Sequence, residues 1–132
     1  MNRHQRRATA KQGRPSIDPA AAGRLDLGIK YHQAGKLAEA EQCYRQVLAQ
    51  HADHPDALQL MGVIASQAGR HDDAADWITR AIRQNSGNAA WFSNLGLVRE
   101  RQGRFEEALA NHNKALELKP DYAEALDRKS VV

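Results

Sequence analysis

Apolar residues recur along most of this chain with the three-to-four-residue spacing of an amphipathic helix. The pattern is interrupted by short polar stretches that contain glycine or proline, which are typical of helix ends. It predicts helices over residues 19–34, 37–51, 55–68, 71–84, 89–102 and 105–118. Asp18-Pro19 and Pro55 are placed as helix starts, and a further segment from Asp121 to Lys129 begins in the same way.

The predicted helices fall into three copies of a 34-residue repeat. Glycine occupies two of its columns and alanine a third. The members are Gly28, Gly62 and Gly96; Gly35, Gly69 and Gly103; and Ala40, Ala74 and Ala108. Each copy therefore contains two helices, joined by a break that reads AGK, AGR or QGR.

The two glycines of each copy have different predicted roles. Gly35, Gly69 and Gly103 stand where a helix ends in a left-handed residue, so we expect them to form the turn. Gly28, Gly62 and Gly96 lie inside a helix, where glycine costs about 1 kcal/mol relative to alanine. We expect them to lie opposite the alanine column, so that small residues on both helices allow close antiparallel packing.

The composition agrees with an all-helical domain. Of the 132 residues 42% are hydrophobic but only 5% are aromatic, so the core is built mainly from Ala, Leu, Ile and Val. There is no apolar run of about 18 residues, and the N-terminus lacks the apolar stretch of a secretory signal. Cys43 is the single cysteine and cannot form an internal disulfide. We expect a soluble, cytoplasmic protein that does not enter a membrane.

Positive charge is concentrated in the first 17 residues. This tail holds five of the 19 basic residues, which are Arg3, Arg6, Arg7, Lys11 and Arg14, and none of the 16 acidic ones. One interpretation is contact with RNA, the ribosome or an acidic protein surface, which would weaken in salt. The other is a disordered tail that aids solubility, which the lack of interleaved aromatic residues favours.

The repeat resembles the tetratricopeptide repeat, with its pattern W-x₂-L-G-x₂-Y…A-x₃-F…P. The third copy matches it at Phe92, Leu95, Gly96, Ala108 and Pro120, and the resemblance covers about residues 19–122. It implies an all-α, right-handed superhelical solenoid of three helix-turn-helix units. These would span residues 18–54, 55–88 and 89–122, after the tail at 1–17 and before a capping helix or truncated fourth repeat at 123–132.

The resemblance also implies a concave groove, lined by the first helix of each unit, that binds a peptide or a partner protein without catalysis. Positions four apart form one stripe on a helix, which in the third copy runs through Ser93, Leu97 and Arg101. The predicted groove residues are Leu25, Ile29, Gln33, Gln59, Val63, Gln67, Asn94, Leu97 and Arg101. The alternative is that Ile29, Val63 and Leu97 belong to the core.

One variant of the family grips the C-terminal carboxylate of chaperones with basic and asparagine side chains. The corresponding positions here are Leu25, Ile29, Leu60, Ala90 and Asn94. None of them is positively charged, so we do not expect a chaperone-tail receptor.

The repeats are also similar to those that precede the catalytic part of O-linked N-acetylglucosamine transferases and their bacterial relatives. An asparagine ladder in that groove holds the peptide backbone. Of the equivalent positions Asp26, Leu60 and Asn94, only Asn94 keeps the asparagine. A targeting arm or fragment of such an enzyme is therefore an alternative function.

No other residues make a case for catalysis, a cofactor or a metal. His51 and His54 fall in a turn, and His112 occupies a column of packed side chains. The His71–Asp73 run opens a helix, where acids favour the N-terminus, and we expect it to cap that helix. Cys43 has no neighbouring histidine to activate it. We expect a protein or peptide partner, with nucleic acid as the weaker alternative. A further expectation is self-association through the C-terminal helix, whose end carries Val131 and Val132.

Overall fold

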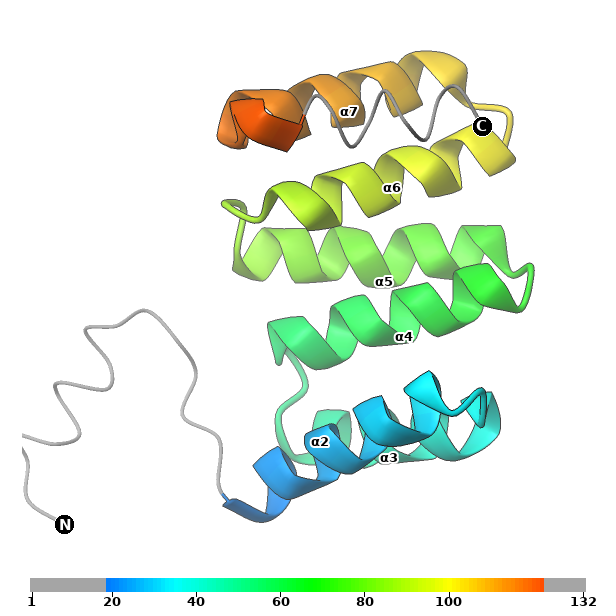
Figure 1. The fold of residues 1–132 in the computed structure, drawn as a ribbon, viewed down its shortest axis with the longest axis vertical. Helices are drawn as coiled ribbons and strands as arrows, with labels where there is room; N and C mark the ends of the chain where they lie inside the picture. The colour runs from blue at the N-terminus through cyan, green and yellow to red at the C-terminus, as the bar shows by residue number, and fades with distance from the viewer. Residues whose placement is uncertain (1–18, 123–132) are drawn as a thin grey trace, which may run out of the picture. The chain divides into compact units, whose positions relative to one another are not determined.

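The computed structural model describes residues 19–122, and no strand occurs among them (Figure 1). The elements are α2 (Pro19–Gln33), α3 (Leu37–Gln50), α4 (Pro55–Gln67), α5 (His71–Gln84), α6 (Ala89–Arg101), α7 (Phe105–Leu118) and the 3₁₀ turn η1 (Pro120–Tyr122). Each predicted helix is confirmed within one residue at both ends. The predicted tail at 1–17, the Asp18 cap and the segment at 123–132 lie outside the described residues.

Local signals account for most helix ends. Pro19 and Pro55 are the first residues of α2 and α4, where a missing backbone N–H costs nothing. Asn88 caps α6, because its Oδ1 accepts a hydrogen bond from the Trp91 N–H at 3.2 Å. Gly35, Gly69 and Gly103 have φ of 79°, 80° and 78°, which confirms their predicted left-handed turn.

The turn after α2 shows how these glycines close a hairpin. The Lys36 N–H donates to the Tyr31 carbonyl at 2.9 Å, and the Gly35 N–H donates to the His32 carbonyl at 3.0 Å. This is the Schellman arrangement, which satisfies carbonyls that the end of a helix leaves without partners. The same pair of bonds recurs after α4 and after α6.

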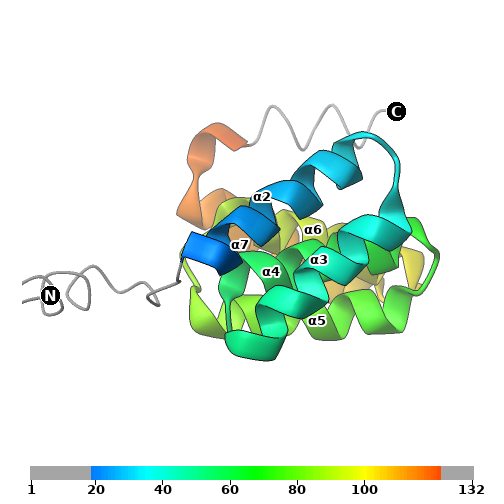
Figure 2. The same cartoon turned by 90° about the horizontal axis from the view of Figure 1, so that it is seen from below.

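The described helices belong to two compact units, with α2 and α3 in the first and α4 through η1 in the second. In the first unit α2 and α3 form a hairpin (Figure 2). Tyr44 is fully buried in it, and its hydroxyl lies 3.2 Å from His32 Nδ1. Burial, and to a smaller extent the neighbouring Cys43, raises the pKa of Tyr44 to about 12.

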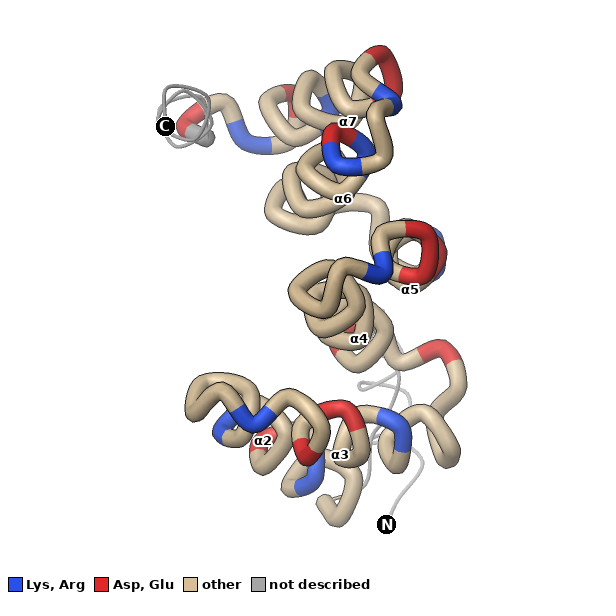
Figure 3. The backbone as a smooth tube through the Cα atoms, turned by 90° about the vertical axis from the view of Figure 1, so that its right-hand side faces the viewer, with Lys and Arg blue, Asp and Glu red and all other residues tan. Residues whose placement is uncertain are grey.

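The second unit contains two hairpins, α4–α5 and α6–α7. Helix α5 packs against α6, and α4 also contacts α6, so the hairpins lie side by side (Figure 3). Small and aliphatic side chains from three helices form the core. This cluster contains Ala65, Ala74, Ala75, Ile78, Leu95 and Val98, with Trp77 and Ile82 packed against it. The all-α helix-turn-helix fold class is confirmed.

The interior glycines allow a close approach of the two helices, but the nearest group is not the expected alanine, and of the three alanines only Ala74 is among the nearest contacts, through its carbonyl oxygen 3.2 Å from a Cβ at Gly62. A Cβ added at Gly28 would lie 2.6 Å from Tyr44 Cε1, and one at Gly96 would lie 2.5 Å from His112 Cε1. At Gly62 the added atom would collide with Ile78 Cγ1. These glycines therefore make room for the large side chain one helical turn beyond the alanine column.

No described helix is both long enough and apolar enough to span a bilayer.

Candidate functional site

The first helices of the two hairpins in the second unit, α4 and α6, place several predicted groove residues on neighbouring elements. Gln59 and Val63 on α4 and Asn94 and Leu97 on α6 are half-buried. Val63 and Leu97 are repeat equivalents, and so each presents a partly accessible apolar side chain. We call Gln59, Val63, Gln67, Asn94, Leu97 and Arg101 the α4–α6 surface.

The burial of neighbouring residues distinguishes this surface from the core. Leu95 and Val98, on either side of the Gly96–Leu97 pair, are 6% and 2% exposed and belong to the core cluster. Leu97 is not among the buried residues. It therefore combines partial packing with an accessible edge.

A polar contact joins the C-terminal ends of α4 and α6. Arg101 Nη1 donates a hydrogen bond to Ser66 Oγ at 3.1 Å, next to the exposed Gln67 in the sequence. The contact holds one positive charge and one amide at the same end of the α4–α6 surface. Ser66 was not predicted, because its role depends on a residue 35 positions away.

The first unit carries the remaining predicted groove residues on α2. Leu25 and Ile29 are half-buried, and Gln33 is exposed in the last turn. Arg24, beside Leu25 in the sequence, donates a hydrogen bond to Gln46 of α3. The apolar column predicted from the repeat thus keeps partial exposure at Ile29, as it does at Val63 and Leu97.

Ser93 is fully buried, so its predicted place on the exposed stripe is wrong. Its Oγ has no hydrogen-bond partner among the described residues. Ser93 is buried because α6 packs against both α5 and α7, so that neighbouring helices cover a larger part of its circumference. Asn94, the next residue, keeps an accessible side chain instead.

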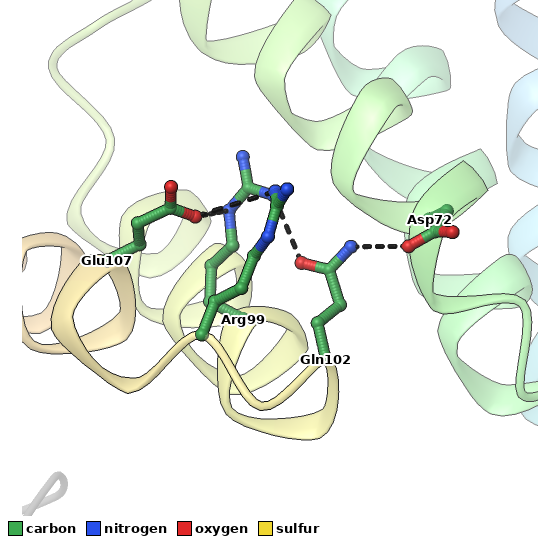
Figure 4. A network of polar contacts seen from close by, with 5 residues as sticks. Asp72, Arg99, Gln102 and Glu107 are labelled. Carbon is green, nitrogen blue, oxygen red and sulfur yellow. Dashed lines mark hydrogen bonds and ion pairs between the residues drawn. The ribbon is translucent and has the colours of Figure 1, made fainter.

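A polar network fastens the start of α5 to α6 and α7 (Figure 4). Gln102 Nε2 donates to Asp72 Oδ1 at 2.7 Å, and Arg99 Nη1 donates to Gln102 Oε1 at 3.0 Å. Arg99 Nε also lies 3.5 Å from Glu107 Oε2. Figure 3 shows the acidic first turn of α5, where Asp72 was expected to act as a helix cap. Instead, Arg70 is the N-cap residue without a side-chain cap bond, and Asp72 links two helices.

Among the described residues, His112, Cys43 and His54 are packed against or buried by other side chains. His112 packs under Gly96, and its Nε2 lies 3.2 Å from Glu100 Oε2. Cys43 and His54 are buried. Within residues 19–122 no three His, Cys, Asp or Glu side chains are arranged to hold a metal ion.

The tetratricopeptide repeat profile matches residues 25–90, and a second profile of the same description matches residues 89–122. Together the two matches include every residue of the α4–α6 surface. They also include the whole of α3 through α7.

Among curated proteins, the chain is 31% identical over 94 residues to the Photosystem I assembly protein Ycf3 of Prochlorococcus marinus (strain MIT 9303). That match covers 69% of this chain and 54% of the relative. The chain thus spans about half the length of the curated relatives it matches.

Two solved structures have closely similar folds. The first repeat domain of Spaghetti (RPAP3), bound to the HSP90 peptide SRMEEVD, has a TM-score of 0.78 and 24% identity, covering 85% of this chain and 90% of that one. An O-GlcNAc transferase of Thermobaculum terrenum has a TM-score of 0.77 and 29% identity. That match covers 82% of this chain and 21% of the transferase.

Proposed function

We propose that this chain, which belongs to the tetratricopeptide repeat family, binds a segment of a partner protein on the first helices of its hairpins and catalyses no reaction. The supporting observation is the partial exposure of the repeat-equivalent side chains Val63 and Leu97 on neighbouring helices. Apolar side chains that stay accessible in successive copies are available to a partner, and a docking surface requires such side chains.

The chemistry of the α4–α6 surface indicates the kind of ligand. Apolar side chains at its centre suit one or two apolar anchors of a peptide. Gln59 and Asn94 supply amides that both donate and accept hydrogen bonds, which suits a peptide backbone. Arg101, held on Ser66 at one end, adds a positive charge that favours an acidic group there.

This ligand differs in our proposal from the acidic chaperone peptide bound by the RPAP3 domain. The five positions that would form a carboxylate clamp carry no basic residue, as the sequence predicts. Of these five, Leu25, Ile29 and Leu60 are half-buried branched aliphatic side chains. An apolar anchor, rather than a terminal carboxylate, is therefore the expected determinant of binding.

A random peptide display library, selected on the full chain, tests this function. Selected peptides should share an apolar anchor, and Leu97→Asp should weaken their binding at least about tenfold, because it places a charge in the apolar strip. Leu118→Asp, the same change at a 37% exposed leucine of α7, is the matched control and should bind normally.

Circular dichroism and thermal unfolding of both variants complete this experiment. Leu97→Asp should keep the helical content of the wild-type chain. If Leu97→Asp or Val63→Asp instead unfolds the protein, these residues belong to the core and the proposed surface is wrong. Selected peptides that bind Leu97→Asp as tightly as wild type would also contradict it.

A second candidate function is the substrate-targeting arm of a glycosyltransferase. It is supported by the 29% identity to the repeats of the Thermobaculum terrenum transferase, over 82% of this chain. Asn94 occupies an asparagine-ladder position and keeps an accessible amide. The parent gene tests this candidate, because a glycosyltransferase reading frame continuing after codon 132 supports it and a stop codon contradicts it.

A further inference from the structure

Large apolar side chains are exposed on α2 and α7, the first and last α-helices that the structure describes. Leu27, on α2, is 44% exposed. Phe105 and Leu109, one turn apart on α7, are 68% and 61% exposed. The α4–α6 surface lies on helices between α2 and α7 in the sequence.

The repeat shows what normally covers these positions. Leu27 is the repeat equivalent of Met61 and Leu95, which are 2% and 6% exposed. Leu109 is the equivalent of Ala75, which is 3% exposed. Leu95 of α6 and Ala75 of α5 belong to one core cluster, where successive hairpins of the second unit meet. Leu27 and Leu109 thus lie at repeat positions that a neighbouring hairpin covers inside the second unit.

We propose that copies of this chain associate end to end, with α2 of one copy packed on α7 of the next in the manner of the α5–α6 contact. Leu27 then packs against Leu109 and Phe105 of the neighbouring copy. The partner is a second copy of the same chain, because each end exposes a leucine at a repeat position that is buried by the other type of helix inside the second unit.

Charge supports the same arrangement. In the α5–α6 contact, the end of α6 meets the first turn of α5, where Gln102 donates to Asp72 at 2.7 Å. Glu106, in the first turn of α7, is the repeat equivalent of Asp72. The last turn of α2 contains the basic residues Lys30 and His32. The repeat equivalent of Gln102 in α2 is Ala34, and Lys30 corresponds to the buried Val98, one turn earlier. Lys30 would therefore enter the contact near the first turn of α7, where an ion pair with Glu106 would have to offset the burial of its charge, and the association should weaken as salt rises.

The symmetry of this contact differs from that of an ordinary dimer. The two surfaces are different, so the contact is heterologous, and a copy that binds at one end leaves its other end open. Association then proceeds beyond two copies. A contact between two α7 helices would instead stop at the dimer, and packing of residues 123–132 on α7 of the same chain would leave the protein monomeric.

Sedimentation equilibrium over a concentration series tests this proposal with charge placed at each end. The variants are Leu27→Arg and Leu109→Arg, with Phe105→Arg as a second α7 variant. Leu118→Arg is the control, because its repeat equivalents Gln50 and Gln84 are exposed polar residues. The average mass of the wild type and of the control should rise with concentration past that of a dimer. Each end variant alone should remain monomeric or associate at least about tenfold more weakly.

Mixing the variants gives the decisive measurement. An equimolar mixture of Leu27→Arg and Leu109→Arg retains one intact α7 end and one intact α2 end, so it should form a dimer and nothing larger. A wild type that is monomeric at every concentration overturns the proposal. So does a dimer that Leu109→Arg disrupts and Leu27→Arg leaves intact, since that result indicates a symmetric α7 contact.

Discussion

At the residue scale, the interior glycines Gly28, Gly62 and Gly96 leave no room for a Cβ, because a side chain of the paired helix lies against each of them. Each faces a side chain of different chemistry, namely Tyr44, Ile78 and His112. One glycine column therefore accommodates an aromatic ring, an aliphatic chain and an imidazole. The backbone position is common to the copies, while the residue that fills the space is not.

Gly62→Ala should destabilise the protein by about 1–3 kcal/mol, the cost of overpacking a core. Its Cβ would collide with Ile78 and would lie 3.2 Å from the Ala74 carbonyl oxygen, and neither atom is free to move away. Gly23→Ala is the control, since nothing lies within 4 Å of its added Cβ, and it should stabilise α2 by about 0.5–1 kcal/mol. Urea unfolding measures both, and equal effects of the two changes would contradict the packing argument.

Tyr44 predicts a loss of stability at high pH. Its folded pKa of about 12 lies above the ordinary value of about 10. The neutral hydroxyl is therefore favoured by folding, and below pH 10 the free energy of unfolding has its full value because Tyr44 is neutral in both states. Between about pH 10 and 12 only the unfolded state ionises, and the free energy of unfolding falls by about 2 kcal/mol.

The measurement for this prediction is urea unfolding of wild type and Tyr44→Phe from about pH 8 to 12, the window set by the two pKa values. The difference in stability between the two proteins should shrink or reverse above about pH 10. The comparison removes pH effects that do not involve residue 44, so a difference that stays constant with pH would show that the folded pKa of Tyr44 is not raised.

At the element scale, each hairpin depends on one left-handed residue. Gly69→Ala should cost about 1 kcal/mol, because φ of 80° is unfavourable for a residue with a Cβ even where space is open. Gly87→Ala, in the α5–α6 connection, is the matched control, since Gly87 has no positive φ. Thermal unfolding should show a lower midpoint for Gly69→Ala alone, and a comparable drop for both would contradict this explanation.

The ends of the elements were predictable because local residues determine them. Proline at α2 and α4, Asn88 before α6 and the three turn glycines act within a few positions of themselves. The contacts between elements were not predictable in the same way. Ser93 was expected on the open stripe and is buried, because the width of the covered arc on α6 depends on two neighbouring helices.

At the scale of the whole molecule, burial is unevenly distributed among the helices. Helices α4 and α6 each contribute six buried residues, whereas α2 and α7 each contribute two. The core cluster draws its members from α4, α5 and α6. We therefore expect the free energy of local unfolding to differ among the described helices, because helices with more buried residues lose more packing when they unfold.

Hydrogen exchange followed by mass spectrometry should reveal this difference. Backbone amides of α4 and α6 should exchange slowest, and those of α2 and α7 fastest, in dilute protein. At higher concentration, end-to-end association should slow exchange in α2 and α7 specifically. Uniform protection across all six described helices would show that buried area does not govern local opening here.

The sequence by itself determined the helices, their ends, the repeat and the family, because spacing, proline and glycine act over a few residues and recur at a fixed interval. Only the tertiary structure decided which side chains fill the space beside the interior glycines, that Asp72 bonds Gln102, and that Leu27 and Leu109 stay exposed. These outcomes depend on which helices meet and which lack a neighbour, and no local pattern encodes contacts between residues tens of positions apart.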